Sequence, residues 1–306
     1  MAYNLTNKLV VAVSSRALFD LETENKVFEE KGLDEYYKHQ LENEANPLSK
    51  GTGYRLIENL LKINSYFSEN EKQVEVIVLS KNNAATSLRI TNAINTYKLD
   101  IQRSGWTSGN DISNYLKAFK VDLFLSASDE DVTNAIQNGV AAAKILPSHQ
   151  DVHNSRGDQV RIAFDGDAVL FSEESELIYK QHGLEAFIEH EKSNKDNPLE
   201  KGPFAKLLLT ISAIQDKFKD KESPIRTALV TARGAPTHER VIKTLNVWGV
   251  RIDEAFFLGG SEKYEVLEAF GADMFFDDQD VHLDLSVSVV PSAKVIHKSI
   301  EAFAKD

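Results

Sequence analysis

Short apolar runs alternate along the chain with longer segments in which apolar side chains recur every three or four positions. The short runs predict strands at Leu9–Val13, Val74–Leu79, Leu123–Leu125, Val160–Phe164, Thr227–Val230 and Met274–Phe276. The segments with helical periodicity are Tyr54–Phe67, Thr86–Tyr97, Phe204–Phe218 and His238–Trp248. Strands that alternate with helices predict an α/β fold with a mainly parallel sheet.

The two halves of the chain repeat one another without a gap at an offset of 151 residues. About 28 of roughly 118 aligned pairs are identical, against roughly 6% expected from ordinary composition. The identical pairs include Gly32 with Gly183, Arg89 with Arg240, and Phe124 with Phe275. The repeat predicts an internal duplication with two similar lobes, 1–150 and 151–306, joined by a polar linker at Ile145–Gln159. Accidental likeness of αβ units is the alternative, and the gapless register counts against it.

The composition and the net charge of the chain limit the kinds of molecule that the protein is expected to bind. An apolar fraction of 42% and a charged fraction of 27% are ordinary for a globular protein, and no apolar run approaches the ~20 residues of a membrane helix. The formal net charge of -12 argues against nucleic acid polymers and anionic membranes. The chain has no cysteine, which excludes disulfides and thiolate metal sites. We expect a cytoplasmic protein that still admits a small phosphorylated substrate, because a bound cation can reverse the local field.

Carboxylate, hydroxyl and ammonium side chains follow the predicted strands of the second lobe. They are Asp165 and Asp167 in FDGD, Thr231 in ALVTARG, Lys263 in GGSEK, and Asp277 and Asp278 in MFFDDQ. In parallel α/β sheets ligands bind beyond the carboxyl ends of the strands, so we expect these side chains to meet there. Clustered buried acids are costly unless they share a cation, and Mg²⁺ prefers oxygen ligands.

The set suits phosphoryl transfer. One carboxylate can attack phosphorus, and a second can protonate the leaving oxygen and then activate water. A threonine hydroxyl, backbone N–H groups and a lysine can hold the phosphoryl oxygens. Taken singly, each residue has a simpler interpretation. Asp165 and Asp167 could form a turn or a calcium-type loop, and Thr231 could be a helix N-cap. Lys263 could be a solvated side chain, and Asp277 and Asp278 could be an N-cap and a surface acid. The occurrence of all these residues in this order along the chain favours a role in phosphoryl transfer over the separate structural interpretations.

The same order of motifs resembles the haloacid dehalogenase superfamily of phosphohydrolases, whose fold is Rossmann-like. The stretches AVSSRALF, FDGDAVLFSEESE, HEK, LVTAR and FFDDQ are similar to the cytosolic 5′-nucleotidase I family, over almost the whole chain from Leu9 to about His282. This resemblance implies two tandem haloacid dehalogenase-like lobes and Mg²⁺-dependent hydrolysis of nucleoside 5′-monophosphates. The C-terminal segment from Asp284 carries no motif that we can assign.

The resemblance also implies a role for each residue. Asp165 would be the nucleophile and Asp167 the general acid and base, with its backbone carbonyl facing the metal. Thr231 and Ala232 would bind the phosphoryl group, with Lys263 stabilising its charge. The metal site would comprise Asp165, Asp167, Asp277 and Asp278.

A helical insert at about 172–224 would form a cap over the site and contact the nucleoside. Arg233 either binds substrate or pairs with surface acids. His190 and Lys192 either touch substrate from the cap or are solvated. Phe187 and Phe204 could stack on a base, although core packing is the simpler interpretation.

The first lobe has lost this chemistry. At the offset of 151, Asp165 corresponds to Ser14 and Asp167 to Arg16, while Lys263 corresponds to Ile112. Asp277 and Asp278 correspond to Ser126 and Ala127. This lobe is either a scaffold or a residual anion site that works without metal. The candidate residues of that site are Ser14, Ser15, Arg16, Ser80 and Asn82.

The leading hypothesis is therefore a Mg²⁺-dependent 5′-nucleotidase. Two alternatives remain open at this point: the same chemistry on another small phosphoester such as a sugar phosphate, and a nucleotide-binding regulator with vestigial activity. The nucleotide is the expected partner, and a homo-oligomer remains open.

Overall fold

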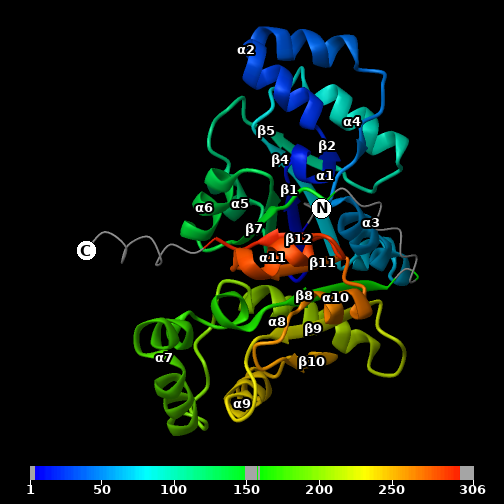
Figure 1. Ribbon diagram of the computed structural model, residues 1–306. Helices are drawn as coiled ribbons and strands as arrows, with labels where there is room; N and C mark the ends of the chain where they lie inside the picture. Colours follow the sequence, from blue (N-terminus) through cyan, green and yellow to red (C-terminus); the bar gives the residue numbers. More distant parts are fainter. Residues whose placement is uncertain (1–3, 149–156, 158, 297–306) are drawn as a thin grey trace. The chain divides into compact units, whose positions relative to one another are not determined.

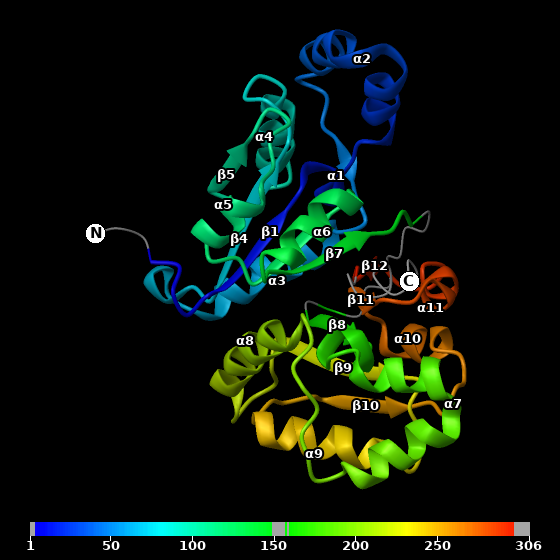
Figure 2. The same ribbon diagram turned by 90° about the vertical axis from the view of Figure 1, so that its left-hand side faces the viewer.

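The computed structural model describes residues 4–148, 157 and 159–296. The chain divides into two compact units, unit 1 at Met1–Ile145 and unit 2 at Leu146–Asp306. Each unit contains five parallel strands with helices packed against them (Figures 1 and 2). The predicted α/β architecture with a mainly parallel sheet is confirmed. Most of the predicted linker lies outside the described residues.

Unit 1 orders its five strands β5-β4-β1-β6-β7, all parallel. The strands are β1 (Leu9–Val13), β4 (Val74–Ser80), β5 (Arg103–Trp106), β6 (Leu123–Ser126) and β7 (Ala141–Ile145). The helices are α1 (Ser15–Leu18), α2 (Glu22–Glu42), α3 (Tyr54–Lys62), α4 (Ser87–Thr96), α5 (Ser113–Ala118) and α6 (Asp129–Gln137). The short strands β2 (Phe19–Asp20) and β3 (Ser49–Lys50) pair antiparallel beside the main sheet, and 3₁₀ turns cover Ile63–Tyr66 and Glu69–Glu71.

Unit 2 orders its five strands β10-β9-β8-β11-β12, also all parallel. The strands are β8 (Val160–Phe164), β9 (Ile225–Thr231), β10 (Glu254–Phe257), β11 (Met274–Asp277) and β12 (Ser292–Lys294). The helices are α7 (Glu174–Ser193), α8 (Ala205–Gln215), α9 (His238–Trp248), α10 (Tyr264–Phe270) and α11 (Asp280–Ser286). A π-type turn, η3, covers Gly166–Leu170, and a 3₁₀ turn covers Asp216–Phe218.

The main strands and their connecting helices match between the units at the offset of 151 residues, and the strand orders are the same. In each unit the chain moves outward over three strands and then crosses to the other side of the first. Right-handed crossovers therefore place the connecting helices on opposite faces of the sheet. The direction changes between β1 and β6 in unit 1 and between β8 and β11 in unit 2. Such switch points are where parallel α/β sheets bind ligands.

The six predicted strands are the three central strands of each sheet. Their residues are almost all buried because helices cover both faces, which produces the continuous apolar runs visible in the sequence. The sequence analysis missed the outer strands. β5 and β10 are only partly buried, and β7 and β12 are short or rich in alanine. β12 accounts for part of the C-terminal segment to which no motif was assigned.

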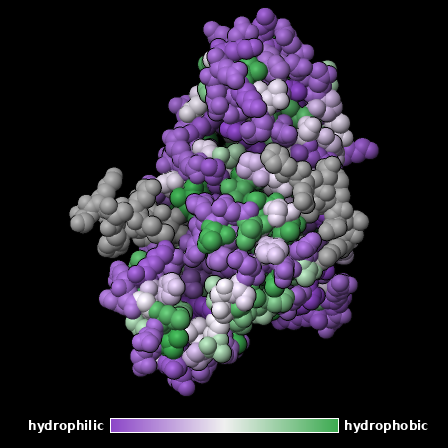
Figure 3. All heavy atoms as spheres, in the orientation of Figure 1, coloured by the Kyte–Doolittle hydropathy of each residue, from purple (hydrophilic) through white to green (hydrophobic). Residues whose placement is uncertain are grey.

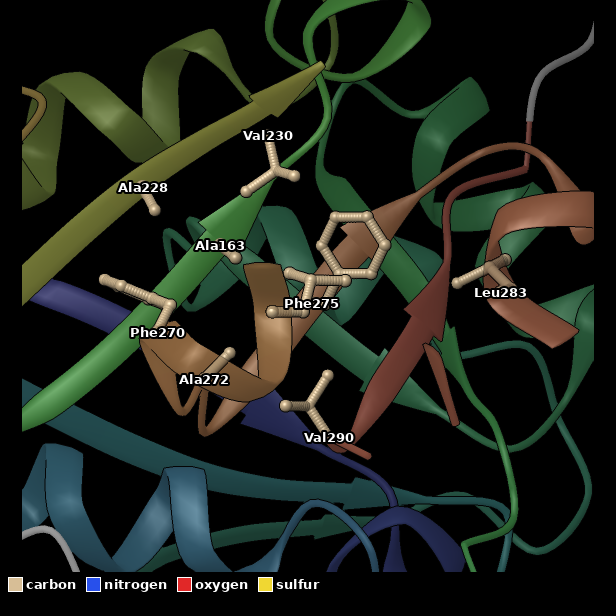
Figure 4. Packing of buried hydrophobic residues seen from close by; sticks show 9 residues of the cluster. Ala163, Ala228, Val230, Phe270, Ala272, Phe275, Leu283 and Val290 are labelled. Carbon is tan, nitrogen blue, oxygen red and sulfur yellow. The ribbon is translucent and has the colours of Figure 1, made fainter. Parts of the chain in front are cut away.

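A hydrophobic cluster on unit 2 fixes the helix that carries Lys263. Ala163 of β8, Ala228 of β9 and Phe275 of β11 point into this cluster (Figure 4). Leu267 and Phe270 of α10 complete it from the helix side. All five side chains are buried, so the position of α10 relative to the sheet is set by packing.

The long helix that follows the first strand of each unit is kinked at a glycine. Gly32 in α2 and Gly183 in α7 both have φ +81° with extended ψ, a conformation open essentially only to glycine. Both helices are largely solvent-exposed, and the surface at the top of Figure 3, where α2 lies, is mainly hydrophilic. In the described part of the chain, no helix combines the length and apolarity that a membrane span requires.

Candidate active site

The loop after β8 places Asp165 at the switch point of unit 2. Asp165 extends the strand, and its N–H donates to the carbonyl of Phe276 at 2.8 Å. A Cβ atom on the next residue, Gly166, would lie 3.3 Å from the Thr231 hydroxyl. Glycine therefore lets the loop approach β9 closely. Ala168 then turns the chain back with φ +62°.

Lys263 bridges Asp165, the candidate nucleophile, and Asp277 at the end of the neighbouring strand β11. Its Nζ donates to Asp165 Oδ1 at 2.6 Å and to Asp277 Oδ2 at 2.7 Å. The side chain is 1% exposed. Although burial opposes the charged form, the two carboxylates raise the pKa of Lys263. The ammonium is therefore held between Asp165 and Asp277, as a charge-stabilising lysine requires.

The acids at this site fit a hard cation. One carboxylate oxygen from each of Asp165, Asp277 and Asp278 lies within 4.8 Å of the others. Both oxygens of Asp278 are buried without a hydrogen-bond partner among the described residues. Burial, together with the charges of Asp165 and Glu176, raises the pKa of Asp278 to about 9. Burial likewise raises the pKa of Asp165 to about 7 against the opposing charge of Lys263. A divalent cation would satisfy these oxygens and keep them ionised.

Asp167 points to a different partner. Arg233 holds both of its oxygens, from Nε at 2.7 Å and Nη2 at 2.6 Å. Arg233 Nη1 also donates to Glu191 of α7. Burial opposes the charge of the guanidinium, but Asp167 and Glu191 raise the pKa of Arg233. Through Arg233 and Glu191, Asp167, the predicted general acid and base, is connected to the kinked helix α7.

The Glu191 carboxylate anchors α7 from a fully buried position. It accepts from Arg240 Nη1 at 2.9 Å and from the Ser175 hydroxyl at 2.8 Å. The sequence analysis did not single out Glu191 or Arg240. Glu191 lies inside the HEK stretch, and Arg240 is one of the residues that recur in the repeat. Those two signals could have identified them. Arg233 is buried and pairs with the buried Glu191 and with Asp167, whose side chain is 16% exposed. Neither partner is a surface acid, so the predicted alternative of pairing with surface acids is wrong.

Of the two phosphate-binding candidates, Thr231 lies against the loop that follows Asp165, where a Cβ atom at Gly166 would lie 3.3 Å from its hydroxyl. Thr231 ends β9, and its buried hydroxyl accepts the Arg233 N–H at 3.2 Å. Ala232 is exposed, and its carbonyl accepts the Gly260 N–H at 3.0 Å. The hydroxyl of Thr231 thus lies next to the loop of Asp165, where it could bind a phosphoryl group attached to that carboxylate.

The cap candidates separate into buried and exposed positions. His190 Nε2 lies 3.3 Å from Arg240 Nη1 and 3.4 Å from Glu174, whereas Lys192 is exposed. Phe204 is buried against Phe164 and Phe276, as the core-packing interpretation predicts. The ring of Phe187 lies 5.3 Å from the Arg233 guanidinium, next to the ion pair with Asp167.

The first-lobe candidates also come together, at the corresponding switch point of unit 1. The Ser15 hydroxyl lies 3.0 Å from the Ser80 hydroxyl, and both are within 2.9 Å of Asn82 Oδ1. Ser14 and Arg16 line the same cavity. No counterpart of the Lys263 ion pair occurs in the described part of unit 1, because the corresponding residues are Ile112, Ser14 and Ser126.

Fold and site together define a class of protein. Unit 2 is a doubly wound α/β unit that gathers carboxylates, a lysine and a threonine at its switch point. This donor set is suited to phosphoryl chemistry with a hard cation.

Comparison with known proteins agrees with that class. The sequence profile of the 5′-nucleotidase family matches residues 1–302, and the chain belongs to this family. It is 38% identical over 287 residues to cytosolic 5′-nucleotidase 1B of Homo sapiens, covering 91% of this chain and 47% of that protein. The chain thus spans about half the length of this curated relative.

The comparison with solved structures is uninformative. A mutant of the O-GlcNAc transferase of Thermobaculum terrenum matches with a TM-score of 0.21 and 10% identity. The match covers 90% of this chain and 50% of that chain. A score this low carries no argument about fold or function.

Proposed function

We propose that this chain hydrolyses nucleoside 5′-monophosphates to nucleoside and phosphate with Mg²⁺. Unit 2 would be the catalytic lobe, with a cap at about 172–224, and the lobe at 1–150 would be non-catalytic. The observation that carries the proposal is the ion pair of Lys263 with Asp165 and Asp277 beside the unpartnered Asp278. Membership of the 5′-nucleotidase family and the name of the human relative support the substrate class and a cytoplasmic location.

In the first step Asp165 attacks the phosphorus of the substrate. The bond from Asp165 to phosphorus forms while the bond from phosphorus to the 5′-oxygen breaks, which gives an aspartyl phosphate. The leaving oxygen takes a proton from Asp167, which must carry that proton when the substrate binds and recovers it from water in the second step. Lys263 is placed to balance the charge on the phosphoryl oxygens, and the Thr231 hydroxyl can donate to one of them.

In the second step water attacks the same phosphorus and gives its proton to Asp167. The bond from phosphorus to Asp165 breaks, which releases phosphate and restores the carboxylate. Because Arg233 binds both oxygens of Asp167, the side chain must turn out of this pair to reach the leaving oxygen. Glu191 can retain Arg233 when Asp167 moves, since it binds a different nitrogen.

Asp165, Asp277 and Asp278, together with the backbone carbonyl of Asp167, would hold Mg²⁺. When bound, the cation polarises the phosphoryl group and lowers the repulsion between the substrate and the clustered acids. The cap would exclude water and select the nucleoside. Arg233, His190 and Lys192 are the proposed contacts on the cap side of the site.

A substrate panel tests the proposal. Phosphate release from nucleoside 5′-monophosphates and from sugar phosphates is measured with Mg²⁺ and with chelator. We expect Mg²⁺-dependent turnover with preference for the nucleotides. Preference for sugar phosphates would identify a different phosphatase, and no turnover of any substrate would favour a regulatory protein.

A matched pair of variants assigns the chemistry to the site. Asp165→Asn should lower kcat by at least about 10⁴-fold because an amide is a poor nucleophile. Asp273→Asn changes another buried carboxylate of unit 2, whose Oδ2 accepts the Arg161 N–H at 2.8 Å at the opposite end of the strands. This control should lower the melting temperature and leave kcat within about threefold. Turnover that survives in Asp165→Asn contradicts the nucleophile assignment.

A further inference from the structure

Unit 1 contains a cavity of about 560 Å³ at the switch point of its own sheet. Residues at or just beyond the ends of β1, β4 and β6 line it, among them Ser15, Asn82 and Ser126, and residues of α2 line its other side. The volume falls within the range of about 300–1,000 Å³ typical of small-molecule sites. The cavity thus occupies the position that corresponds to the proposed active site of unit 2.

The charge at these positions is reversed between the units. Six residues define the site in unit 2, and four of them are carboxylates against two cations, a formal charge of -2. They are Asp165, Asp167, Arg233, Lys263, Asp277 and Asp278. The corresponding residues in unit 1 are Ser14, Arg16, Asn82, Ile112, Ser126 and Ala127, with a formal charge of +1. Unit 2 therefore needs a cation to accept an anion, whereas the same positions in unit 1 do not.

Donor groups of the cavity are arranged around the hydroxyls of Ser15 and Ser80. Asn82 Oδ1 accepts from both hydroxyls, so each must turn away from Asn82 to donate to a phosphate oxygen, and Asn82 Nδ2 donates to the Tyr36 hydroxyl at 2.8 Å. Arg16 Nη2 binds Glu22 at 2.9 Å, but Arg16 Nε is buried and has no acceptor among the described residues. This unsatisfied donor points to a missing anionic or carbonyl acceptor in the cavity.

The acids that line the cavity are paired with cations. Glu24 binds Arg89 at 2.6 Å. Asp131 and Glu130 both bind Lys81, at 2.8 and 3.0 Å. Each of these acids therefore has a cation within 3.0 Å, whereas both oxygens of Asp278 in unit 2 lack a hydrogen-bond partner among the described residues.

An aromatic pair is retained above both sites. Phe28 and Tyr36 of α2 meet edge to face with centroids 5.8 Å apart, and both line the cavity. The corresponding residues of α7, Tyr179 and Phe187, meet in the same way at 6.2 Å. Phe28 is 48% exposed, so its ring is accessible to a flat heterocycle. Both units thus combine a polar end at the strands with aromatic rings on the kinked helix.

We infer that unit 1 binds a nucleoside 5′-monophosphate without metal and without hydrolysing it. The phosphate lies against Ser15, Ser80 and Arg16, and the base lies against Phe28 and Tyr36. The nucleoside part of this inference rests on the proposed function, because it takes the retained aromatic pair to serve the same class of molecule in both units. No hydrolysis occurs there because Ser14 and Arg16 replace the nucleophile and the acid.

Equilibrium dialysis of the intact chain with AMP in excess chelator tests the inference. Without a cation unit 2 repels the phosphate, so we expect one AMP per chain, bound in unit 1. Adenosine and inorganic phosphate should each compete at least about tenfold more weakly than AMP, because each fills half of the site. Equal competition by either fragment would overturn the two-part site.

Substitutions locate the bound molecule. Asn82→Asp keeps the shape of the side chain and adds a negative charge beside the phosphate, which should weaken AMP binding by at least about tenfold. Lys81→Ala should weaken it several-fold because Glu130 and Asp131 lose their cation. Lys144→Ala is the matched control: Lys144 is as exposed as Lys81, at 29%, and binds Asp129, but does not line the cavity. It should leave binding unchanged.

Two results would overturn the inference: no AMP binding in chelator, or binding that Asn82→Asp leaves unchanged. If circular dichroism shows that Asn82→Asp does not fold, the difference between Lys81→Ala and Lys144→Ala decides in its place. Hydrolysis of AMP with Mg²⁺ is measured on the same proteins. Binding that Asn82→Asp abolishes in a chain without turnover would support this site and reject the proposed function, and turnover without binding in chelator would do the reverse.

Discussion

The two units have the same strand order and the same kinked helix, yet their switch points differ in almost every polar side chain. Unit 2 buries Lys263 between Asp165 and Asp277, and unit 1 places Ile112, Ser14 and Ser126 at those positions. Both sheets are nevertheless covered and buried in the same way. The ion cluster is therefore not required to form this sheet, which supports the proposed catalytic role.

The largest effect is expected when unit 2 receives the residues of unit 1. In the triple variant Asp165→Ser, Lys263→Ile and Asp277→Ser, activity should fall by at least about 10⁴-fold because the proposed nucleophile and two of the proposed metal ligands are lost. The free energy of unfolding should change by less than about 2 kcal/mol, since Lys263 and both of its buried carboxylate partners are replaced together by neutral groups. Phosphate release and denaturant unfolding measure the two quantities. A large loss of stability would show that the cluster also supports the fold.

A smaller effect, on the free energy of unfolding, is expected when the buried carboxylate that binds Arg240 is moved to the position that it has in unit 1. Glu191 of unit 2 corresponds to Gln40, and Ser175 corresponds to Glu24, which binds Arg89 as Glu191 binds Arg240. Glu191→Gln should lower the free energy of unfolding by about 3 kcal/mol because Arg240 loses its buried partner. Adding Ser175→Glu should recover at least half of that loss, as measured by denaturant unfolding. No recovery would mean that the two arrangements are not interchangeable.

The loop after the first strand gives a third contrast. Gly166 corresponds to Ser15, and a Cβ atom at Gly166 would press on the Thr231 hydroxyl at 3.3 Å. Gly166→Ala should lower kcat by about tenfold, since small displacements of reacting groups are costly. Its melting temperature should stay within a few degrees of the parent protein. Unchanged kcat would show that Thr231 tolerates the displacement.

The smallest effect should be the same in both units. A Cβ atom at Gly32 or Gly183 would meet nothing within 4 Å, so alanine there costs only the backbone strain of φ +81°. Gly32→Ala and Gly183→Ala should each destabilise the chain by about 1–2 kcal/mol in denaturant unfolding. Clearly unequal losses would show that the two kinks are held by different forces.

The sequence could predict the central strands because their apolar runs are buried on both faces. It could not predict β5 or β10, whose residues are partly exposed, or β12, which is three residues long. Asp165, Lys263 and Asp277 were recognisable because each lies at the end of a predicted strand or the start of a helix. Glu191 was not singled out, although it lies in the HEK stretch, because the local hydrophobic pattern does not reveal that an acid near the end of α7 is buried.

The sequence alone determined the α/β alternation, the register of the repeat and the residues that replace the acids in the first lobe, because these depend on local periodicity and residue type. Only the tertiary structure decided that Arg233 binds Asp167 through two nitrogens, that the buried oxygens of Asp278 have no hydrogen-bond partner among the described residues, and that a cavity lies at the switch point of unit 1. Those features depend on which side chains from distant segments share a buried volume, and spacing along the chain does not contain that information.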